Sequence, residues 1–260
     1  MVLLVDLGNS ALSVGVYEHD VCQHRFFTNS DRHKTAIEYQ LILKSFLLET
    51  SYTFAECEAI VFCSVVPPLT PIIKQALAAI FQAPILMLGK KLKTGLALHV
   101  DHPSEVGADL VAASVGAITK YQAPCVIIDM GTATKIIAVD EKGAFVGVTI
   151  APGLMVSLKG LIGQASQLSD VDLSLPPQVI GRNTIDAVNS GSLYGHACLV
   201  EGLALKVAKE LNTDKPIILT GGYSKLIRPL VPQFVYDENL LFDGLLTIYN
   251  KNRSNYHEKQ

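Results

Sequence analysis

One pattern that occurs twice constrains the fold of this chain more than any other feature. An apolar run ends in Asp, a glycine turn follows, and a second apolar run returns. Apolar runs on either side of such a turn are typical of β-hairpins. Two copies far apart in the chain indicate two domains and not a solenoid. The copies are residues 2–6 (VLLVD), 8–10 and 12–17 (LSVGVY), and residues 125–129 (CVIID), 131–134 and 135–139 (KIIAV).

The segments around these hairpins alternate between helical and strand-like periodicity, which predicts an α/β fold with a mixed sheet repeated twice. A third hairpin is expected through Glu141-Lys142-Gly143. We expect one domain at residues 1–118, a second at 119–250, and a polar tail at 251–260. The other predicted helices cover 37–48, 69–81, 104–120, 154–162, 184–211 and 223–230, and the other predicted strands cover 59–66, 146–150 and 216–220.

Composition narrows the class of partner. The chain has 260 residues, of which 49% are hydrophobic and 17% charged, so it can bury a large core. Its net charge of -3 and the absence of a basic stripe argue against nucleic acid as the main partner. No apolar stretch is long enough for a membrane helix. Five scattered cysteines without a C-x-x-C pair fit a reducing compartment. We therefore expect a cytoplasmic enzyme with a small ligand.

The two glycine turns have the composition of a phosphate site. Polyphosphate needs backbone N–H donors at close range, which glycine allows, and Asn, Ser or Thr add side-chain donors. A carboxylate beside a triphosphate is repelled unless a cation lies between them, so Asp6 and Asp129 imply Mg²⁺ or a monovalent ion. The chain lacks the P-loop and dinucleotide-binding glycine motifs. One such turn is weak support for ATP binding, whereas two equivalent turns favour it.

Further short motifs follow one another along nearly the whole chain, and together they resemble the type III pantothenate kinase family, also named for its Bvg accessory factor members. The motifs are Asp6-x-Gly8-Asn9-Ser10, Cys63-Ser64-Val65-Val66-Pro67, Pro103-x-x-Val106-Gly107-Ala108-Asp109, Asp129-x-Gly131-Thr132-Ala133-Thr134, Pro152-Gly153-Leu154, Gly181-x-Asn183-Thr184 and Thr220-Gly221-Gly222. The resemblance implies an acetate kinase/actin-like (ribonuclease H-like) fold and a homodimer. It also implies transfer of the ATP γ-phosphoryl group to pantothenate in coenzyme A biosynthesis, and a required K⁺ or NH₄⁺.

The resemblance also implies roles for single residues. Asp109 is expected to be the general base that accepts the pantothenate hydroxyl proton, and Asp129 the potassium ligand. Asp6 is expected to act through Mg²⁺. The expected ATP contacts are Asp6, Leu7, Gly8, Asn9, Ser10, Ala11, Leu12, Ser13, Gly131 and Thr132, and the expected substrate contacts are Val100, Gly107, Ala108, Asp109, Leu110 and Thr184, the last from the neighbouring subunit.

Two of these residues have alternative explanations in helix chemistry. Asp109 falls in the first turn of a predicted helix, where a carboxylate stabilises the free N–H groups and the dipole. Thr184 stands where an N-cap would precede the next helix. The residue types alone leave both alternatives open.

Three positions depart from the family's pattern. The family has Arg where this chain has Leu110, usually Tyr where it has Val100, and a second Thr where it has Lys135. Losing a charge-assisted contact to the substrate carboxylate costs about 1.5–3 kcal/mol. One hypothesis is that Lys135 replaces the missing charge, although a solvated lysine on a strand edge explains it equally well. Other hypotheses are a diverged paralogue with another acceptor and a non-catalytic nucleotide-binding regulator.

Overall fold

The computed structural model describes residues 1–89, 92–164 and 172–254. Within these ranges the chain divides into two units. The first unit contains Met1–Gly95, Ser104–Gly116 and Leu241–Gln260, and the second contains Leu96–Pro103 and Ala117–Leu240. The expected boundary at residues 118/119 falls two residues beyond the division after Gly116, but the end of the chain groups with the first unit. The expected polar tail falls mainly on residues outside the described part of the chain.

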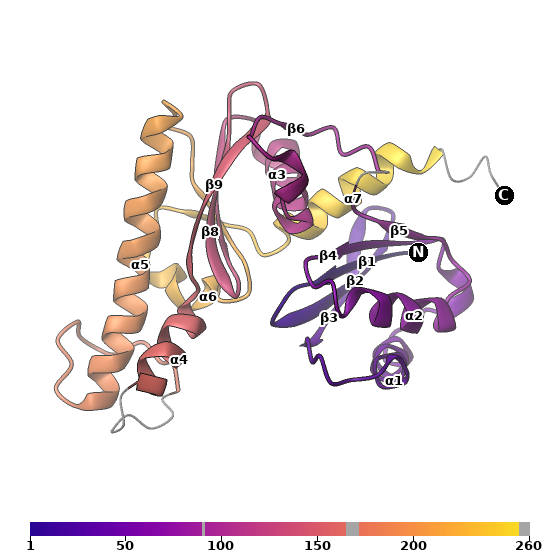
Figure 1. The fold of residues 1–260 in the computed structure, drawn as a ribbon, viewed down its shortest axis with the longest axis horizontal. Helices are drawn as coiled ribbons and strands as arrows, with labels where there is room; N and C mark the ends of the chain where they lie inside the picture. Colours follow the sequence, from indigo (N-terminus) through magenta and orange to yellow (C-terminus); the bar gives the residue numbers. More distant parts are fainter. Residues whose placement is uncertain (90–91, 165–171, 255–260) are drawn as a thin grey trace. The chain divides into compact units, whose positions relative to one another are not determined.

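The first unit is built on a five-stranded mixed sheet (Figure 1). The strands lie in the order β3-β2-β1-β4-β5. Strands β1, β2 and β3 form antiparallel pairs, whereas β4 runs parallel to β1, and β5 runs parallel to β4. Their bounds are β1 Val2–Leu7, β2 Ala11–Glu18, β3 Val21–Asn29, β4 Ala59–Ser64 and β5 Ile85–Met87.

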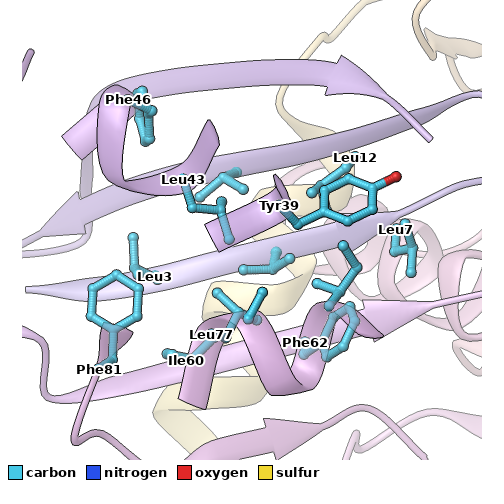
Figure 2. Packing of buried hydrophobic residues seen from close by; sticks show 14 of the residues in the cluster. Leu3, Leu7, Leu12, Tyr39, Leu43, Phe46, Ile60, Phe62, Leu77 and Phe81 are labelled. Carbon is cyan, nitrogen blue, oxygen red and sulfur yellow. The ribbon is translucent and has the colours of Figure 1, made fainter. Parts of the chain in front are cut away.

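Helices α1 (Ala36–Leu48) and α2 (Thr70–Ile80) cover one face of this sheet (Figures 1 and 2). Side chains alternate across a strand, so Leu3, Val5 and Leu7 of β1 point into this core. Helix α1 begins with a capping box in which Thr35 and Glu38 bond each other's backbone N–H groups. Figure 2 shows the packed side chains, of which each fully buried Leu or Phe contributes about 1.5–3 kcal/mol.

The opposite face of the first sheet carries Asp6 and is packed by α7 (Leu240–Asn252). Phe242 of α7 stacks on Tyr17 of β2, with 6.3 Å between ring centroids. Gly244 of the same helix lies so close to the backbone of Ala112 that a Cβ there would overlap it. Ala112 belongs to α3 (Ala108–Tyr121), so this glycine allows α3 and α7 to touch.

The second unit repeats the same sheet order, with one strand added at the edge. Its order β6-β9-β8-β7-β10-β11 places β7 and β8 where β1 and β2 stand in the first sheet. The strands are β6 Ala97–Leu98, β7 Cys125–Met130, β8 Ala133–Val139, β9 Ala144–Pro152, β10 Ile218–Thr220 and β11 Val235–Tyr236. The helices are α4 Leu154–Gln164, α5 Thr184–Glu210 and α6 Ser224–Ile227, and short 3-10 turns occur at Phe54–Glu56, Pro103–Glu105 and Arg228–Leu230.

Most predicted elements are confirmed, and the three predicted hairpins are all present. The predicted helix at 104–120 begins four residues later, because residues 103–105 form a separate 3-10 turn. Strands β3, β5, β6 and β11 and helix α7 were not predicted. Within the described ranges, no helix has the length and hydropathy needed to cross a bilayer.

Candidate active site

The first glycine turn follows the end of β1 in the first unit. Asp6 lies in register with Ser13 of β2 and with Cys63 of β4, so these three side chains share one face of the sheet. The N–H of Gly8 donates to the carbonyl oxygen of Ala11 at 2.9 Å and closes the turn. Asn9 and Ser10 are exposed at its tip. Leu7 and Leu12 point into the core, so only their backbone atoms could contact a nucleotide.

The loop after β3 supports this turn. Ser30 donates its Oγ hydrogen to the carbonyl of Gly8 at 2.7 Å and its backbone N–H to the carbonyl of Ser10 at 3.0 Å. The loop is anchored in turn by Tyr39, whose buried hydroxyl accepts from the N–H of Asp31 and donates to its carbonyl. Figure 2 shows Tyr39 packed among the core leucines. The position of the turn therefore depends on a core residue.

Arg32 lies beside the first turn, and the sequence patterns did not single it out. Its guanidinium donates to Oδ1 of Asn9 at 3.4 Å, which puts a positive charge over the tip of the first turn. A planar guanidinium is well suited to phosphate. Only the polar run at residues 30–34 (SDRHK) could have signalled it, and such runs are common in loops.

Asp109 lies in the first turn of α3, as expected, and at the same end of the sheet as the first glycine turn. Its Oδ1 accepts from the N–H of Leu110 at 2.8 Å. Gly107 packs near Val65, whose N–H donates to the carbonyl of Leu7 at 3.1 Å. These contacts tie the start of α3 to the ends of β4 and β1. The carboxyl ends of parallel strands are where ligands bind in open α/β sheets.

The departures from the family's pattern differ in their surroundings. The Leu110 side chain is only 7% exposed, so it contributes packing and no polar contact. Val100 is half-buried in the second unit, in the segment between β6 and the Pro103–Glu105 turn. Neither side chain can donate a hydrogen bond to a carboxylate.

The second glycine turn is closed in the same way, by a bond from the Gly131 N–H to the carbonyl of Ala133 at 3.0 Å. Two further glycines pack against it. A Cβ on Gly153 would lie 2.6 Å from the carbonyl oxygen of Gly131, and a Cβ on Gly221 would lie 2.7 Å from Oδ1 of Asp129. Gly221 also has φ +97, which side chains rarely tolerate. The Pro-Gly and Thr-Gly-Gly motifs therefore hold the turn by close backbone packing.

Asp129 and Lys135 form an ion pair at the base of this turn. They are directly opposite in the antiparallel pair β7/β8, and Nζ of Lys135 lies 2.5 Å from Oδ2 of Asp129. The Lys135 side chain is 14% exposed and the Asp129 side chain is 12% exposed. The idea of a solvated lysine on a strand edge is therefore wrong. On the opposite face of the hairpin, Thr134 bonds Nε2 of His196 at 2.7 Å, and burial lowers the pKa of that imidazole.

Thr184 is the exposed first residue of α5, and its helix is capped by Asn183. The Asn183 side chain accepts from the N–H of Asp186 at 2.8 Å, so the proposal that Thr184 is the N-cap is wrong. Thr184 lines a pocket of about 780 Å³ that lies wholly within the second unit, between α4 and α5. The pocket wall includes both apolar and hydroxyl side chains.

The donor sets fit a polyphosphate better than a protein-bound metal. Each turn offers backbone N–H groups and hydroxyl or amide side chains, and the first adds a guanidinium, which is the chemistry that phosphate oxygens require. Among the described residues, no three His, Cys, Asp or Glu side chains gather into a metal site. A magnesium ion would thus be held by one carboxylate together with phosphates and water, as is usual for kinases.

A sheet repeated twice, with a glycine turn after an Asp in each copy, defines the actin-like class of ATP-dependent kinases and ATPases, as the sequence predicted. The solved structure of MreB 5 of Spiroplasma citri bound to AMPPNP matches with a TM-score of 0.57 and 10% identity, over 100% of this chain and 98% of that one. The activator of the 2-hydroxyisocaproyl-CoA dehydratase from Clostridium difficile with bound ADPNP matches with a TM-score of 0.54 and 11% identity, over 99% of this chain and 97% of that one.

The chain belongs to the type III pantothenate kinase family. The family's sequence profile matches residues 2–206. The type III pantothenate kinase of an Exiguobacterium species is 36% identical over 254 residues, which are 97% of this chain and all of the relative. That of Brevibacillus brevis is 36% identical over 255 residues, 98% of this chain and again all of the relative. These relatives lend no support to the paralogue or regulator hypotheses.

Proposed function

We propose that this chain transfers the γ-phosphoryl group of ATP to the hydroxyl of pantothenate and gives 4'-phosphopantothenate for coenzyme A biosynthesis. The proposal rests on family membership over almost the whole chain. The observation in the structure that supports it is the matched pair of glycine turns, one after β1 and one after β7. Their hydrogen-bond donors and their close backbone packing support phosphate binding.

In this proposal the first turn holds the phosphates of ATP through the backbone N–H groups of Asn9 and Ser10 and through their side chains. Thr132 contributes a further phosphate contact from the second turn. Asp6 holds Mg²⁺, which when bound neutralises charge on the phosphate oxygens. Arg32 adds a positive charge at the tip of the first turn, close to Asn9.

Asp109 is the proposed general base. As the pantothenate oxygen forms its bond to the γ-phosphorus and the bond to ADP breaks, the hydroxyl proton passes to the Asp109 carboxylate. The backbone N–H of Leu110 donates to Oδ1 of Asp109 and orients this carboxylate, so no other side chain is needed to hold it. Phosphoryl transfer has a loose transition state, so positioning of this kind supplies most of what the base must do. Gly107 leaves space for the carboxylate, since a Cβ there would lie 2.5 Å from Oδ1.

The acceptor site should hold pantothenate weakly. Leu110 is buried and apolar where the family's pattern implies an arginine, and Val100 replaces an expected tyrosine. The loss of one charge-assisted contact corresponds to about a ten- to hundredfold rise in KM. We expect the remaining substrate contacts from Gly107, Ala108 and Asp109, and from Thr184 of a neighbouring subunit.

A homodimer belongs to the same proposal, because Thr184 is exposed at the start of α5 and could reach a second copy. Exposed apolar side chains nearby, including Ile185 at 58% exposure, suit such a contact.

The five cysteines are free thiols, which suits the proposed cytoplasmic location. A monovalent cation fits Asp129 poorly, because that carboxylate already has an ammonium partner.

The test is turnover by the purified protein with ATP, Mg²⁺ and pantothenate, followed by ADP release and by mass spectrometry of the product. Asp109→Asn should lower kcat by about 10²–10⁴-fold, the usual contribution of a positioned base. Asp214→Asn is the matched control, because Asp214 is exposed on the loop after α5. Equal kcat values for Asp109→Asn and Asp214→Asn would contradict the assignment of the base.

A further inference from the structure

The ion pair of Asp129 and Lys135 is built into the backbone of the second hairpin. The two residues face each other across an antiparallel pair, where side chains directly opposite are close neighbours. The ammonium needs no loop movement to reach the carboxylate. Because both side chains are largely buried, solvent and dissolved salt screen the pair only weakly.

The first hairpin shows that the fold does not require a lysine at this place. In the repeated topology, Asp6 and Ser13 stand on β1 and β2 as Asp129 and Lys135 stand on β7 and β8. A hydroxyl lies opposite the carboxylate in one copy, and an ammonium lies opposite it in the other. The charge on Lys135 therefore serves a local purpose in the second copy.

That purpose follows from the electrostatics of the turn. A carboxylate at the base of a phosphate turn repels the nucleotide unless a positive charge accompanies it. A bound K⁺ or NH₄⁺ would supply one unit of charge, surrounded by oxygen atoms. A lysine ammonium supplies the same charge as a compact group with three N–H donors that also seek oxygen atoms.

The surroundings of Asp129 also leave little room for a second cation. Oδ2 is in contact with the ammonium at 2.5 Å. On the side of Oδ1, the backbone of Gly221 packs so closely that a Cβ there would lie 2.7 Å from the oxygen. Thr220, in register with Asp129 on β10, is buried. A potassium ion bound to this carboxylate would lie next to the ammonium, and the two like charges would repel each other.

We infer that Nζ of Lys135 takes the place of a monovalent cation at Asp129, so that this kinase works without K⁺ or NH₄⁺. The inference rests on the proposed function for its activity assay. The inference differs from the hypothesis that Lys135 replaces the arginine missing at Leu110. The Lys135 ammonium is paired with Asp129 of its own hairpin and not with the substrate carboxylate.

The experiment compares the wild type with Lys135→Thr, which restores the hydroxyl residue of the family's pattern. Turnover with ATP, Mg²⁺ and pantothenate is measured in tetramethylammonium chloride and in KCl at equal ionic strength. The wild type should turn over equally in both salts. Lys135→Thr should be slow in tetramethylammonium and stimulated about ten- to hundredfold by K⁺ or NH₄⁺, the value of one charge-assisted contact. Lys142→Thr, at the exposed tip of the next hairpin, should resemble the wild type.

Dependence of the wild-type turnover on K⁺ would overturn the inference, and so would a Lys135→Thr variant that K⁺ fails to stimulate. A second readout separates this failure from failure of the proposed function. If the wild type shows no turnover in either salt, the pantothenate kinase proposal fails, and thermal unfolding then tests the cation site. Potassium should raise the melting temperature of Lys135→Thr, since binding to the folded state stabilises it, and should leave the wild type unchanged. Equal responses of the two proteins to potassium would reject the inference.

Discussion

Replacing Gly153 with alanine tests whether the second glycine turn positions the nucleotide. The added Cβ would lie 2.6 Å from the carbonyl oxygen of Gly131, and closer still to that of Thr132. Real Cβ atoms essentially never approach within 3.0 Å of another heavy atom. Because the neighbours are backbone atoms, they cannot rotate away as a flexible side chain would. The turn and the Pro152-Gly153 segment must therefore separate, by at least about 0.4 Å from the 2.6 Å contact alone.

Such a movement has two measurable consequences. Overpacking of this kind costs about 1–3 kcal/mol, which lowers the melting temperature by roughly 2–12 °C for a chain of this size. Misplacement by about 1 Å can cost 100-fold in rate, so a shift of this size should lower kcat/KM for ATP by about tenfold or more.

Coupled-enzyme kinetics and thermal unfolding measure the two effects on the same preparation. Gly160→Ala in α4 is the matched control, because a Cβ there meets nothing within 4 Å. In a helix this change should leave activity intact and stabilise by up to about 1 kcal/mol. If Gly153→Ala kept the wild-type kcat/KM for ATP, the proposed role of this turn would be refuted.

Two further predictions concern single contacts. Arg32→Ala should raise KM for ATP about two- to fivefold, as expected for an exposed charge, and leave KM for pantothenate unchanged. Steady-state kinetics measure both constants, with Lys142→Ala as the exposed control. Equal KM values for ATP in the two variants would contradict the prediction. His196 has its pKa lowered from 6.5 by burial, so wild-type stability should be complete above pH 6.5 and fall as the pH drops toward the lowered pKa. Urea unfolding across this range should show a weaker pH dependence in His196→Gln, and equal slopes would contradict the prediction.

The sequence predicted the elements whose side chains are buried in a regular pattern. The apolar runs that end in Asp6 and Asp129 form β1 and β7, and the turns after them lie where they were predicted. Burial on both faces makes such runs continuous, and continuous runs are easy to recognise. Two of the family's motifs, Pro152-Gly153 and Thr220-Gly221-Gly222, pack against the second turn.

The missed elements, of which β3 and α7 are the longest, have weaker local signals. Strand β3 (Val21–Asn29) is at the sheet edge, where its residues alternate between exposed and half-buried, and five of its nine residues are polar. Helix α7 contains Gly244, which lowers helix propensity, and the contact with α3 that requires this glycine is between residues far apart in the chain. Tertiary packing determines both elements.

The site residues divide in the same way. Motif spacing located Asp109 and both turns. The contact of Arg32 with Asn9 depends on how the loop after β3 packs on the first turn, and the pairing of Lys135 with Asp129 depends on strand register. Sequence alone showed that Lys135 departs from the family's pattern, and it left two explanations open. The register of β7 and β8 shows which group the ammonium meets.

The facing positions on β7 and β8 have a consequence for how an ionic requirement can change during evolution. In a β-hairpin the partner of each side chain is fixed by the backbone, so a single codon change opposite Asp129 can bring a permanent counterion while the strand pairing stays the same. A lineage could therefore gain or lose dependence on the salt of its cell in one mutational step, and the nucleotide-binding backbone would remain as it was.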